Sequence, residues 1–252
     1  MSNSRQFERQ YLRGLRAAGR WVSNPASERG VTHAFEAVFC LAGPMIEREF
    51  SQFAAHPVGA RLLKERPDLL DFIADAGRMA AMPAGSFGRA YYDFMNRPNV
   101  ADARAFAKLA GIEKTCARLG WDGDVAWFME RMSHSHDLFH VLSGYGSDIA
   151  GEGAVIWFTY GQYPLPVLWG ILGILGGMRP RVGWRRWHRY LRQAYRRGAE
   201  CSPLSCADYE RLFALPIEEV RRQLGITPIE QAHPREGLIV DYMGVPQAAG
   251  LK

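Results

Sequence analysis

The sequence predicts an all-α fold, a single helical domain with little or no strand, and three observations support this. Apolar residues recur three and four positions apart along nearly the whole of the 252-residue chain, which is the spacing of one face of an α-helix. The apolar–polar alternation of a β-strand is missing, apart from a short extended piece, "GLIVDYM", at residues 237–243. Prolines stand at several points where a first helical turn could begin.

The predicted helices follow one another with short connections. They cover residues 34–42, 58–64, 67–76, 88–95, 102–109, 124–143, 148–161, 184–197 and 216–225. We expect residues 1–30 to form an N-terminal helical arm, residues 31–227 the helical domain, and residues 228–252 an irregular C-terminal tail. The hydrophobic content of 48% and the charged content of 23% are those of an ordinary globular protein.

The cysteines and the N-terminus bear on the compartment. Four cysteines are scattered along the chain and none forms a CxxC pair, which favours free thiols in a reducing compartment over a disulfide framework or a cysteine-bound zinc. The N-terminus, "MSNSRQFERQYLRGLRAAGRW", lacks the apolar core of a secretory signal. Its arginines, with Glu8 the only acid, leave open a mitochondrial presequence or an amphipathic helix of the folded protein.

A stretch of 24 residues without a charge, residues 154–177, is long enough to span a bilayer as a helix. Pro164 and Pro166 divide it into halves that are each too short to span, because proline lacks the amide donor and clashes with the preceding turn. We therefore expect a buried apolar hairpin, or a pocket for a long apolar ligand, in preference to a spanning helix.

The segment that follows concentrates the positive charge of the protein. Residues 179–200 contain eight arginines and one glutamate, which exceeds the net charge of +5 of the whole chain. They predict one amphipathic helix with an apolar side and a basic side. The apolar side carries Trp184, Trp187, Leu191 and Ala194, and the basic side carries Arg185, Arg189, Arg192 and Arg196. This pattern suits an anionic membrane surface, and a solvated face of a bundle is the alternative. No nucleic-acid partner is expected, since no recognition motif accompanies the charge.

Three of the seven histidines lie within seven residues, in "MSHSHDLFHVLSGYGSDIAGE" at residues 132–152. On a helix over residues 124–143, His136, Asp137 and His140 fall within an arc of roughly 100° and continue its inward-facing register. His134 lies about 200° from His136 around the helix and is expected at the surface. Three potential metal ligands therefore point the same way.

A second helix is expected to bring a fourth ligand to the same place. "GYGS" at residues 144–147 stops the first helix, and Ser147 or Asp148 can cap the next. In an antiparallel hairpin, His140 lies one turn before the bend and Glu152 one turn after it, facing the histidines. Two imidazoles and two carboxylates suit a divalent metal. Zinc is the first choice because no soft or redox-specific ligand is present, with cobalt, iron and manganese as alternatives.

The competing interpretation is a helix face whose histidines are satisfied by ordinary hydrogen bonds, and a lone HxxxH would not exclude it. Four ionisable groups on an inward face would leave buried charge uncompensated without a cation or a dense hydrogen-bond network, which favours the metal. Two known motifs fit poorly. HD-type phosphohydrolases draw further ligands from distant helices, and HExxH metalloproteases have a glutamate where this chain has Asp137.

The spacing of these residues resembles the HDxxH–x11–E signature of the coenzyme Q biosynthesis protein 4 family. Three further stretches resemble that family in the same order, and together they cover roughly residues 30–226. They are "HPVGARLLKERPDL" (56–69), similar to DPVG..IL.ERP, "MPAGSFGRAYYDFM" (82–95), similar to LPEGSLGREY..F, and "DYERLFALPIEEVRRQLGI" (208–226), similar to a closing helix that ends in LGI. His56 stands at an aspartate-like position, and the arginine-rich segment is more basic than the family pattern. Neither departure touches the motif.

The resemblance implies an all-helical peripheral membrane protein of ubiquinone synthesis that acts on polyprenylated 4-hydroxybenzoate-type precursors. It implies a carboxy-lyase that removes the ring's C1 carboxylate, with or without coupled hydroxylation, and that organises other enzymes of the pathway. Its metal ligands would be His136, Asp137, His140 and Glu152. Asp137, at the edge of the ligand arc, is also the candidate catalytic proton carrier.

We also expect a homodimer. Its place would be the cytoplasmic face of a bacterial inner membrane, or the matrix side of the mitochondrial inner membrane in a eukaryote. Two other function classes stay open: a non-catalytic lipid-binding scaffold with a structural metal, and a metal-dependent hydrolase of another lipid. The first predicts assembly without turnover, and the second predicts cleavage of a phosphate or an ester.

Overall fold

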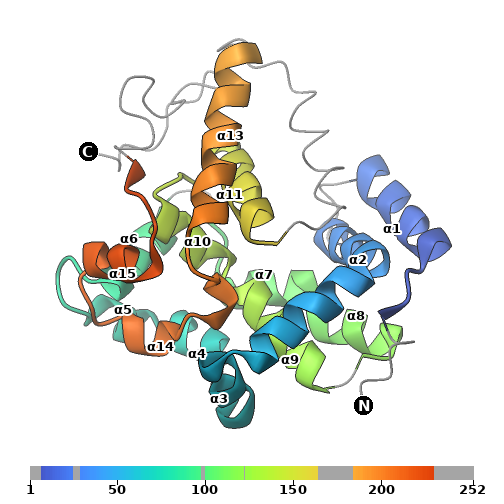
Figure 1. The fold of residues 1–252 in the computed structure, drawn as a ribbon, viewed down its shortest axis with the longest axis horizontal. Coiled ribbons are helices and arrows are strands. Elements are labelled where there is room, and N and C mark those ends of the chain that lie inside the picture. The colour runs from blue at the N-terminus through green and yellow to red at the C-terminus, as the bar shows by residue number, and fades with distance from the viewer. Residues whose placement is uncertain (1–6, 25–28, 98–99, 122, 164–183, 230–252) are drawn as a thin grey trace. The chain divides into compact units, whose positions relative to one another are not determined.

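The computed structural model describes residues 7–24, 29–97, 100–121, 123–163 and 184–229, and these residues are all-α (Figure 1). The nearest approach to a sheet within them is an isolated antiparallel bridge between Ser86 and Pro216. The all-α prediction is therefore confirmed. By its internal contacts the chain divides into two compact units. The first draws on the described residues of 1–74 and 102–135, and the second on those of 75–101, 136–164 and 170–252.

The first unit is built around a long helix and an aromatic core. Its helices are α1 (Tyr11–Ser23), α2 (Gly30–Ala55), α3 (Pro57–Glu65), α4 (Leu69–Ala74), α7 (Ala103–Ala110), α8 (Ile112–Leu119) and α9 (Gly123–His134). Trp121 packs between Phe7 and Phe39, with ring centroids 5.6 and 5.2 Å away. The amphipathic segment at the N-terminus forms α1, whose Ala17 is buried where the helix packs along α2.

The second unit carries the predicted metal ligands. Its helices are α5 (Ala76–Ala80), α6 (Phe87–Met95), α10 (His136–Ser143), α11 (Ile149–Gln162), α13 (Trp184–Glu200), α14 (Tyr209–Leu212) and α15 (Ile217–Leu224), with a 3₁₀ turn at Leu204–Cys206. Phe87 stacks on Phe213 at 4.9 Å and joins α6 to the C-terminal helices. α6 and α15 both pack against α10.

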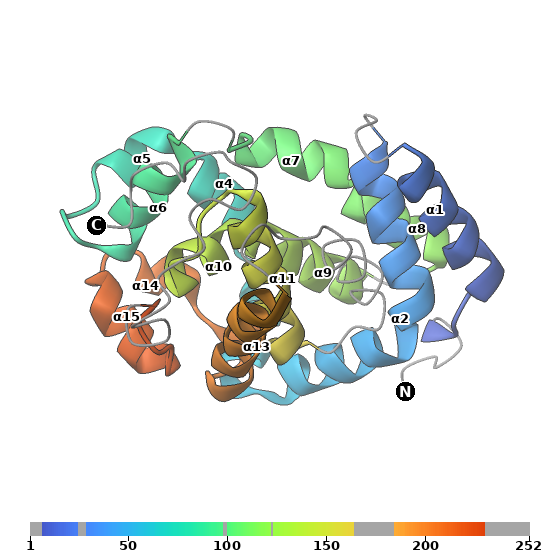
Figure 2. The ribbon, with the colours of Figure 1, turned by 90° about the horizontal axis from the view of Figure 1, so that it is seen from above.

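Helices α11 and α13 lie side by side along much of their length (Figures 1 and 2). Two glycines make this close approach possible. A Cβ atom on Gly198 would lie 2.0 Å from the Phe158 carbonyl oxygen, and one on Gly161 would lie 2.3 Å from the Tyr195 carbonyl oxygen. Because each contact is with backbone, a larger side chain could not be accommodated by a rotamer change.

Three predicted helices show instructive differences from the boundaries found in the structure. The helix expected over residues 124–143 is two helices, since α9 ends at His134 and α10 begins at His136. Between them the Ser135 hydroxyl donates to the Arg131 carbonyl oxygen at 2.8 Å, a local bond that competes with helix continuation. The helix expected over residues 67–76 is shorter, as α4, and the one expected over residues 34–42 is longer, as α2.

Several other predictions can be placed. None of the four cysteines, all of which lie in the described residues, forms a disulfide, as expected. Residues 154–163 of the uncharged stretch belong to α11, whereas residues 164–177, with the prolines expected to divide it, lie outside the described residues. The extended piece at 237–243 also lies outside them. Among the helices that are described, none has the length and apolarity needed to cross a membrane.

Candidate metal centre

The predicted helical hairpin is formed by α10 and α11. α10 ends at Ser143, and Gly144 follows with a φ of +79°, a left-handed conformation that glycine adopts without strain. Asp148 then caps α11, its Oδ1 accepting from the amides of Ala150 and Gly151 at 2.9 and 3.1 Å. A Cβ on Gly151 would lie 1.9 Å from the Gly146 carbonyl oxygen, so glycine is needed here for the bend to pack against α11. These local features place Glu152 in the first turn of α11.

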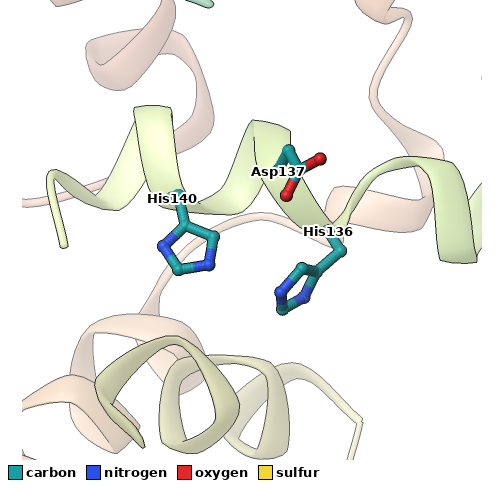
Figure 3. A group of neighbouring side chains, drawn as sticks. All are labelled: His136, Asp137 and His140. Carbon is teal, nitrogen blue, oxygen red and sulfur yellow. The ribbon is translucent and has the colours of Figure 1, made fainter. Parts of the chain in front are cut away.

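The structure brings the four predicted ligands together. Glu152 Oε2 lies 3.5 Å from His136 Nε2, and Glu152 Oε1 lies 3.3 Å from His140 Nε2. His136, Asp137 and His140 each offer one ligand atom within 4.8 Å of the others. Figure 3 shows the two histidine rings on one stretch of α10, with the Asp137 carboxylate beside them. The cluster is therefore a geometric finding, and its role as a metal site is an inference.

The two histidines lie in different surroundings. The His140 side chain has 0% exposure, while those of His136 and Glu152 are 34% and 41% exposed. Phe94 of α6 stacks on the His140 ring at 5.2 Å, and the His136 and His140 rings meet edge to face at 5.0 Å. The cluster thus has an enclosed inner histidine and a face that opens to solvent.

Mutual charge shifts the pKa values of the cluster. Burial opposes ionisation of Glu152, but the neighbouring His136 and His140 hold its pKa well below the usual range. Burial also disfavours the charged form of His136, yet Glu152 and Asp137 raise its pKa above 6.5. Burial, together with the charge of Glu152, raises the pKa of Asp137 above 3.8 against the opposing effect of the histidines. The cluster therefore combines a carboxylate that stays ionised, that of Glu152, with a carboxyl group that retains its proton more readily, that of Asp137.

One atom of the cluster, His140 Nε2, favours the interpretation that a cation binds here. His140 Nε2 is buried and makes no aligned hydrogen bond, although Glu152 Oε1 lies only 3.3 Å away. His140 Nδ1 is already used, because it lies 3.2 Å from the Tyr145 carbonyl oxygen and must donate to it. In the neutral form of His140 the lone pair therefore belongs to Nε2, the atom turned toward Glu152. Imidazole nitrogens beside carboxylates fit the ligand preferences of zinc and of other divalent metals.

The remaining residues singled out in the sequence are placed elsewhere. His134, expected at the surface, is half-buried in the first unit, where it lines a pocket of about 440 Å³ with Trp127 and Glu130. Burial lowers its pKa. His134 is thus only partly exposed, since α4 packs against the helix that carries it. On α13 the predicted basic side is exposed, at Arg185, Arg189, Arg192 and Arg196, and the apolar side is buried, at Trp187, Leu191 and Ala194. The side chain of Trp184 and residues 179–183 lie outside the described residues.

Sequence reasoning missed the groups that hold the site in place. Phe94 is 46 positions before His140 and belongs to another helix, and Arg197 was counted only as part of the basic segment. Arg197 is in fact 2% exposed and reaches the end of α10. The one signal that could have placed Arg197 on the buried side is its position along the helix. It follows Ala194 of the apolar side by three residues, which keeps it on that face, and follows the exposed Arg192 by five.

An open groove of about 830 Å³ lies along the same two helices that carry Glu152 and the arginines. It is lined by Trp157 and Tyr160 of α11 and by Arg185, His188, Arg189, Arg192 and Tyr195 of α13. Trp157, Tyr160 and Tyr195 meet one another at 5.8–6.4 Å. The groove therefore has an aromatic floor and a basic rim, within the size range of small-molecule sites.

Comparison with known proteins gives consistent matches. The chain is 27% identical over 188 residues to the mitochondrial ubiquinone biosynthesis protein COQ4 of Coprinopsis cinerea, covering 73% of this chain and 61% of that protein. It is 30% identical over 181 residues to the mitochondrial COQ4 homolog of Bos taurus, covering 70% and 63%. The chain thus spans less than two thirds of the length of these relatives.

A solved structure shares the fold. It is the crystal structure of a candidate ubiquinone biosynthesis protein from Nostoc punctiforme, with a TM-score of 0.59, 20% identity, and coverage of 87% of this chain and 99% of that one. The profile of the family described as coenzyme Q (ubiquinone) biosynthesis protein Coq4 matches residues 5–230, which is most of the chain. The protein therefore belongs to the Coq4 family of ubiquinone biosynthesis proteins.

Proposed function

We propose that this protein is a metal-dependent carboxy-lyase of ubiquinone synthesis that removes the C1 carboxylate from a polyprenylated 4-hydroxybenzoate-type precursor at a membrane surface. The observation that carries the proposal is the unsatisfied His140 Nε2, buried beside Glu152 in a cluster with His136 and Asp137. Family membership supplies the pathway, and the substrate and reaction are the proposal.

His136, Asp137, His140 and Glu152 would hold one divalent metal, zinc first and cobalt, iron or manganese next. The bound metal would supply a Lewis acid toward the substrate's carboxylate or phenolic oxygen as CO₂ leaves. His140, stacked under Phe94, would fix the inner side of the site, and the half-exposed His136 and Glu152 would leave the outer side accessible.

Asp137 is the candidate proton carrier. When the bond between C1 and its carboxylate breaks, the electron pair stays on the ring and CO₂ departs, so C1 must take up a proton. A carboxyl group near the metal ligands can deliver that proton if it ligates weakly or not at all. Burial raises the pKa of Asp137, which agrees with a proton-holding role.

The aromatic groove would accommodate the isoprenoid tail. Trp157 follows Glu152 by five residues on α11, a rise of roughly 7.5 Å and a rotation of roughly 140° about the helix axis. A tail that begins at the site would therefore have to cross the surface of α11 to reach the groove, where each CH₂ group removed from water would contribute about 0.8 kcal/mol. The basic rim would face lipid headgroups, placing the protein peripherally on a bacterial inner membrane or on the matrix side of the mitochondrial one.

A scaffold that organises other enzymes of the pathway is the alternative, and its metal would be structural. The basic face of α13 supports it, since a charged surface suits assembly as well as lipid. This alternative predicts metal binding and assembly without turnover.

The test is turnover of a prenylated 4-hydroxybenzoate by metal-analysed protein, with and without oxygen. We expect CO₂ release by the wild type, retention of much of the metal with loss of turnover in Asp137→Asn, and loss of both in His136→Ala. Turnover only with oxygen would assign the hydroxylating form of the reaction. A fully loaded wild type that releases no CO₂ under either condition would favour the scaffold.

A further inference from the structure

Arg197 occupies an unusual place for a residue of a basic surface helix. It is 2% exposed, whereas the five other arginines of α13 are exposed to solvent. Burying a guanidinium costs several kcal/mol unless its donors are used. Its Nη2 donates to the Ser143 carbonyl oxygen at 2.8 Å, and Nε and Nη2 donate to the Thr227 carbonyl oxygen at 3.0 and 2.6 Å. Nε and Nη2 of the buried guanidinium are thus directed at backbone, while Nη1 makes no hydrogen bond.

The backbone that Arg197 holds belongs to the turn after the metal-ligand helix. Ser143 is the last residue of α10, and Tyr145 follows two positions later with its ring centroid 5.0 Å from the guanidinium carbon. Tyr145 is 1% exposed. Arg197 therefore contacts the turn at two points, the Ser143 carbonyl oxygen and the Tyr145 ring. The last carbonyls of a helix have no partner within it, which is why the bond to Ser143 is available.

The same turn sets the orientation of His140. The Tyr145 carbonyl oxygen accepts the Nδ1 proton of His140 at 3.2 Å. Since a neutral imidazole carries one proton, this bond leaves Nε2 as the acceptor, and Nε2 is the atom that lies 3.3 Å from Glu152 Oε1. Hydrogen bonds to the far nitrogen of a ligating histidine fix both the tautomer and the ring in many metal sites.

We propose that Arg197 is a positioning residue for the metal centre: it holds the turn at 143–145 so that the Tyr145 carbonyl keeps the proton of His140 on Nδ1 and its Nε2 free for a cation. This rests on the proposed metal site, but the tautomer of His140 is a property of the metal-free protein as well.

Arg221 provides a matched control. It also donates to the end of α10, from Nε to the Leu142 carbonyl oxygen at 2.9 Å and from Nη2 to the Val141 carbonyl oxygen at 3.0 Å. It therefore stabilises the same helix end by the same chemistry, one and two residues before the turn that Arg197 holds. A purely structural role of Arg197 would lower stability in its variants without changing the tautomer of His140, as we expect for Arg221.

The experiment compares Arg197→Met and Arg197→Lys with Arg221→Met and Arg221→Lys in the full-length protein. Two-bond ¹H–¹⁵N correlations of ¹⁵N-histidine-labelled, metal-free protein at pH 8 report which nitrogen of His140 carries the proton. Competition with a chromophoric chelator gives the Zn²⁺ dissociation constant, and thermal unfolding gives the loss of stability. Arg197→Lys keeps the charge but lacks the planar fork, so it stays informative if Arg197→Met does not fold.

We expect the wild type and the Arg221 variants to keep the proton on Nδ1 and to bind Zn²⁺ alike. In Arg197→Met, His140 should lose the single Nδ1–H form and Zn²⁺ affinity should fall about 10–100-fold, with a smaller fall in Arg197→Lys. An Nδ1–H tautomer and a Zn²⁺ affinity that are unchanged in both Arg197 variants would overturn the proposal. If the wild type itself binds no Zn²⁺, the metal site fails, and the tautomer comparison still decides the role of Arg197.

Discussion

At the scale of single residues, the four clustered side chains divide into one that is enclosed and others that face solvent. His140 has no exposed side-chain surface, and its two nitrogens are directed to different partners, the Tyr145 carbonyl and Glu152. His136 and Glu152 are partly exposed. We therefore expect His140 to determine whether a metal is held, and His136 and Glu152 to determine how the site responds to pH.

Replacing His140 by Ala should abolish stoichiometric metal, because it removes the buried ligand nitrogen and the ring on which Phe94 stacks. The loss of affinity should exceed the 10–100-fold typical of outer-shell changes. Elemental analysis of purified protein measures it, with circular dichroism to confirm helicity. His134→Ala, a histidine six positions earlier in the other unit, is the control and should leave the metal unchanged. Full metal content in His140→Ala would mean that the site is misassigned.

The pH dependence of the metal-free protein should carry the signature of the ion pair between His136 and Glu152. The folded-state pKa of His136 is raised above 6.5, so its stabilising effect is complete below pH 6.5 and is lost as the pH rises through the folded-state value. The folded-state pKa of Glu152 is held well below 4.5, so its effect is present above pH 4.5 and is lost on further acidification.

The difference in unfolding free energy between wild type and Glu152→Gln should therefore be largest between about pH 4.5 and 6.5 and should shrink on either side. Urea unfolding of both proteins across the pH range measures it, after dialysis against chelator. Glu200→Gln, which changes an exposed glutamate of the same unit, is the control. A difference that is constant from pH 4 to 8 would exclude this ion pair.

At the scale of elements, the site depends on how closely α11 approaches its neighbours. Gly151 lets the bend after α10 pack on α11, and Gly161 and Gly198 let the backbones of α11 and α13 meet. Gln162 reinforces the far end, where its side-chain oxygen accepts from the Leu204 amide at 2.9 Å. Because Glu152 lies in the first turn of α11, whatever displaces that helix also displaces the carboxylate near the two histidines.

Replacing Gly198 by Ala should destabilise the protein by about 1–3 kcal/mol, since the added Cβ would lie 2.0 Å from the Phe158 carbonyl oxygen and the helices must separate. Gly19→Ala in α1 is the matched control: no atom lies within 4 Å of its added Cβ. It should be neutral or stabilising by up to about 1 kcal/mol through helix propensity. Urea midpoints at an unchanged m-value report both changes. Equal midpoints for the two variants would contradict the close-packing argument.

At the scale of the whole molecule, charge is distributed unevenly. The net charge is +5, yet one segment of 22 residues holds eight arginines. Three of the exposed arginines of α13, Arg185, Arg189 and Arg192, line the aromatic groove. A surface with a basic rim and an aromatic floor suits the boundary between headgroups and acyl chains.

Changing Arg185, Arg189, Arg192 and Arg196 to Gln should release the protein from anionic liposomes. Binding of the wild type should weaken as salt rises, because exposed charge is screened within about 8–10 Å at 0.1–0.15 M. Liposome co-sedimentation measures both effects.

The control for that experiment changes the same net charge elsewhere, at Arg48, Arg78, Arg104 and Arg211, which are also exposed. Their surface ion pairs contribute little to stability, so this variant should fold and stay bound. Equal loss of binding in the two quadruple variants would reduce the effect to net charge. Binding that resists salt and carbonate and yields only to detergent would contradict a peripheral surface.

The sequence by itself determined the all-α class, the grouping of His136, Asp137, His140 and Glu152, and the two sides of α13. These features follow from helical periodicity and from turn and capping residues. Such signals act over a few positions and can therefore be recognised in the sequence alone. Only the tertiary structure decided that Phe94 stacks on His140, that Arg197 turns inward to hold Ser143 and Tyr145, and that His134 is half-buried within the first unit. Contacts between helices far apart in the chain depend on which faces pack, and that choice is made by the burial of the whole core, which no local pattern records.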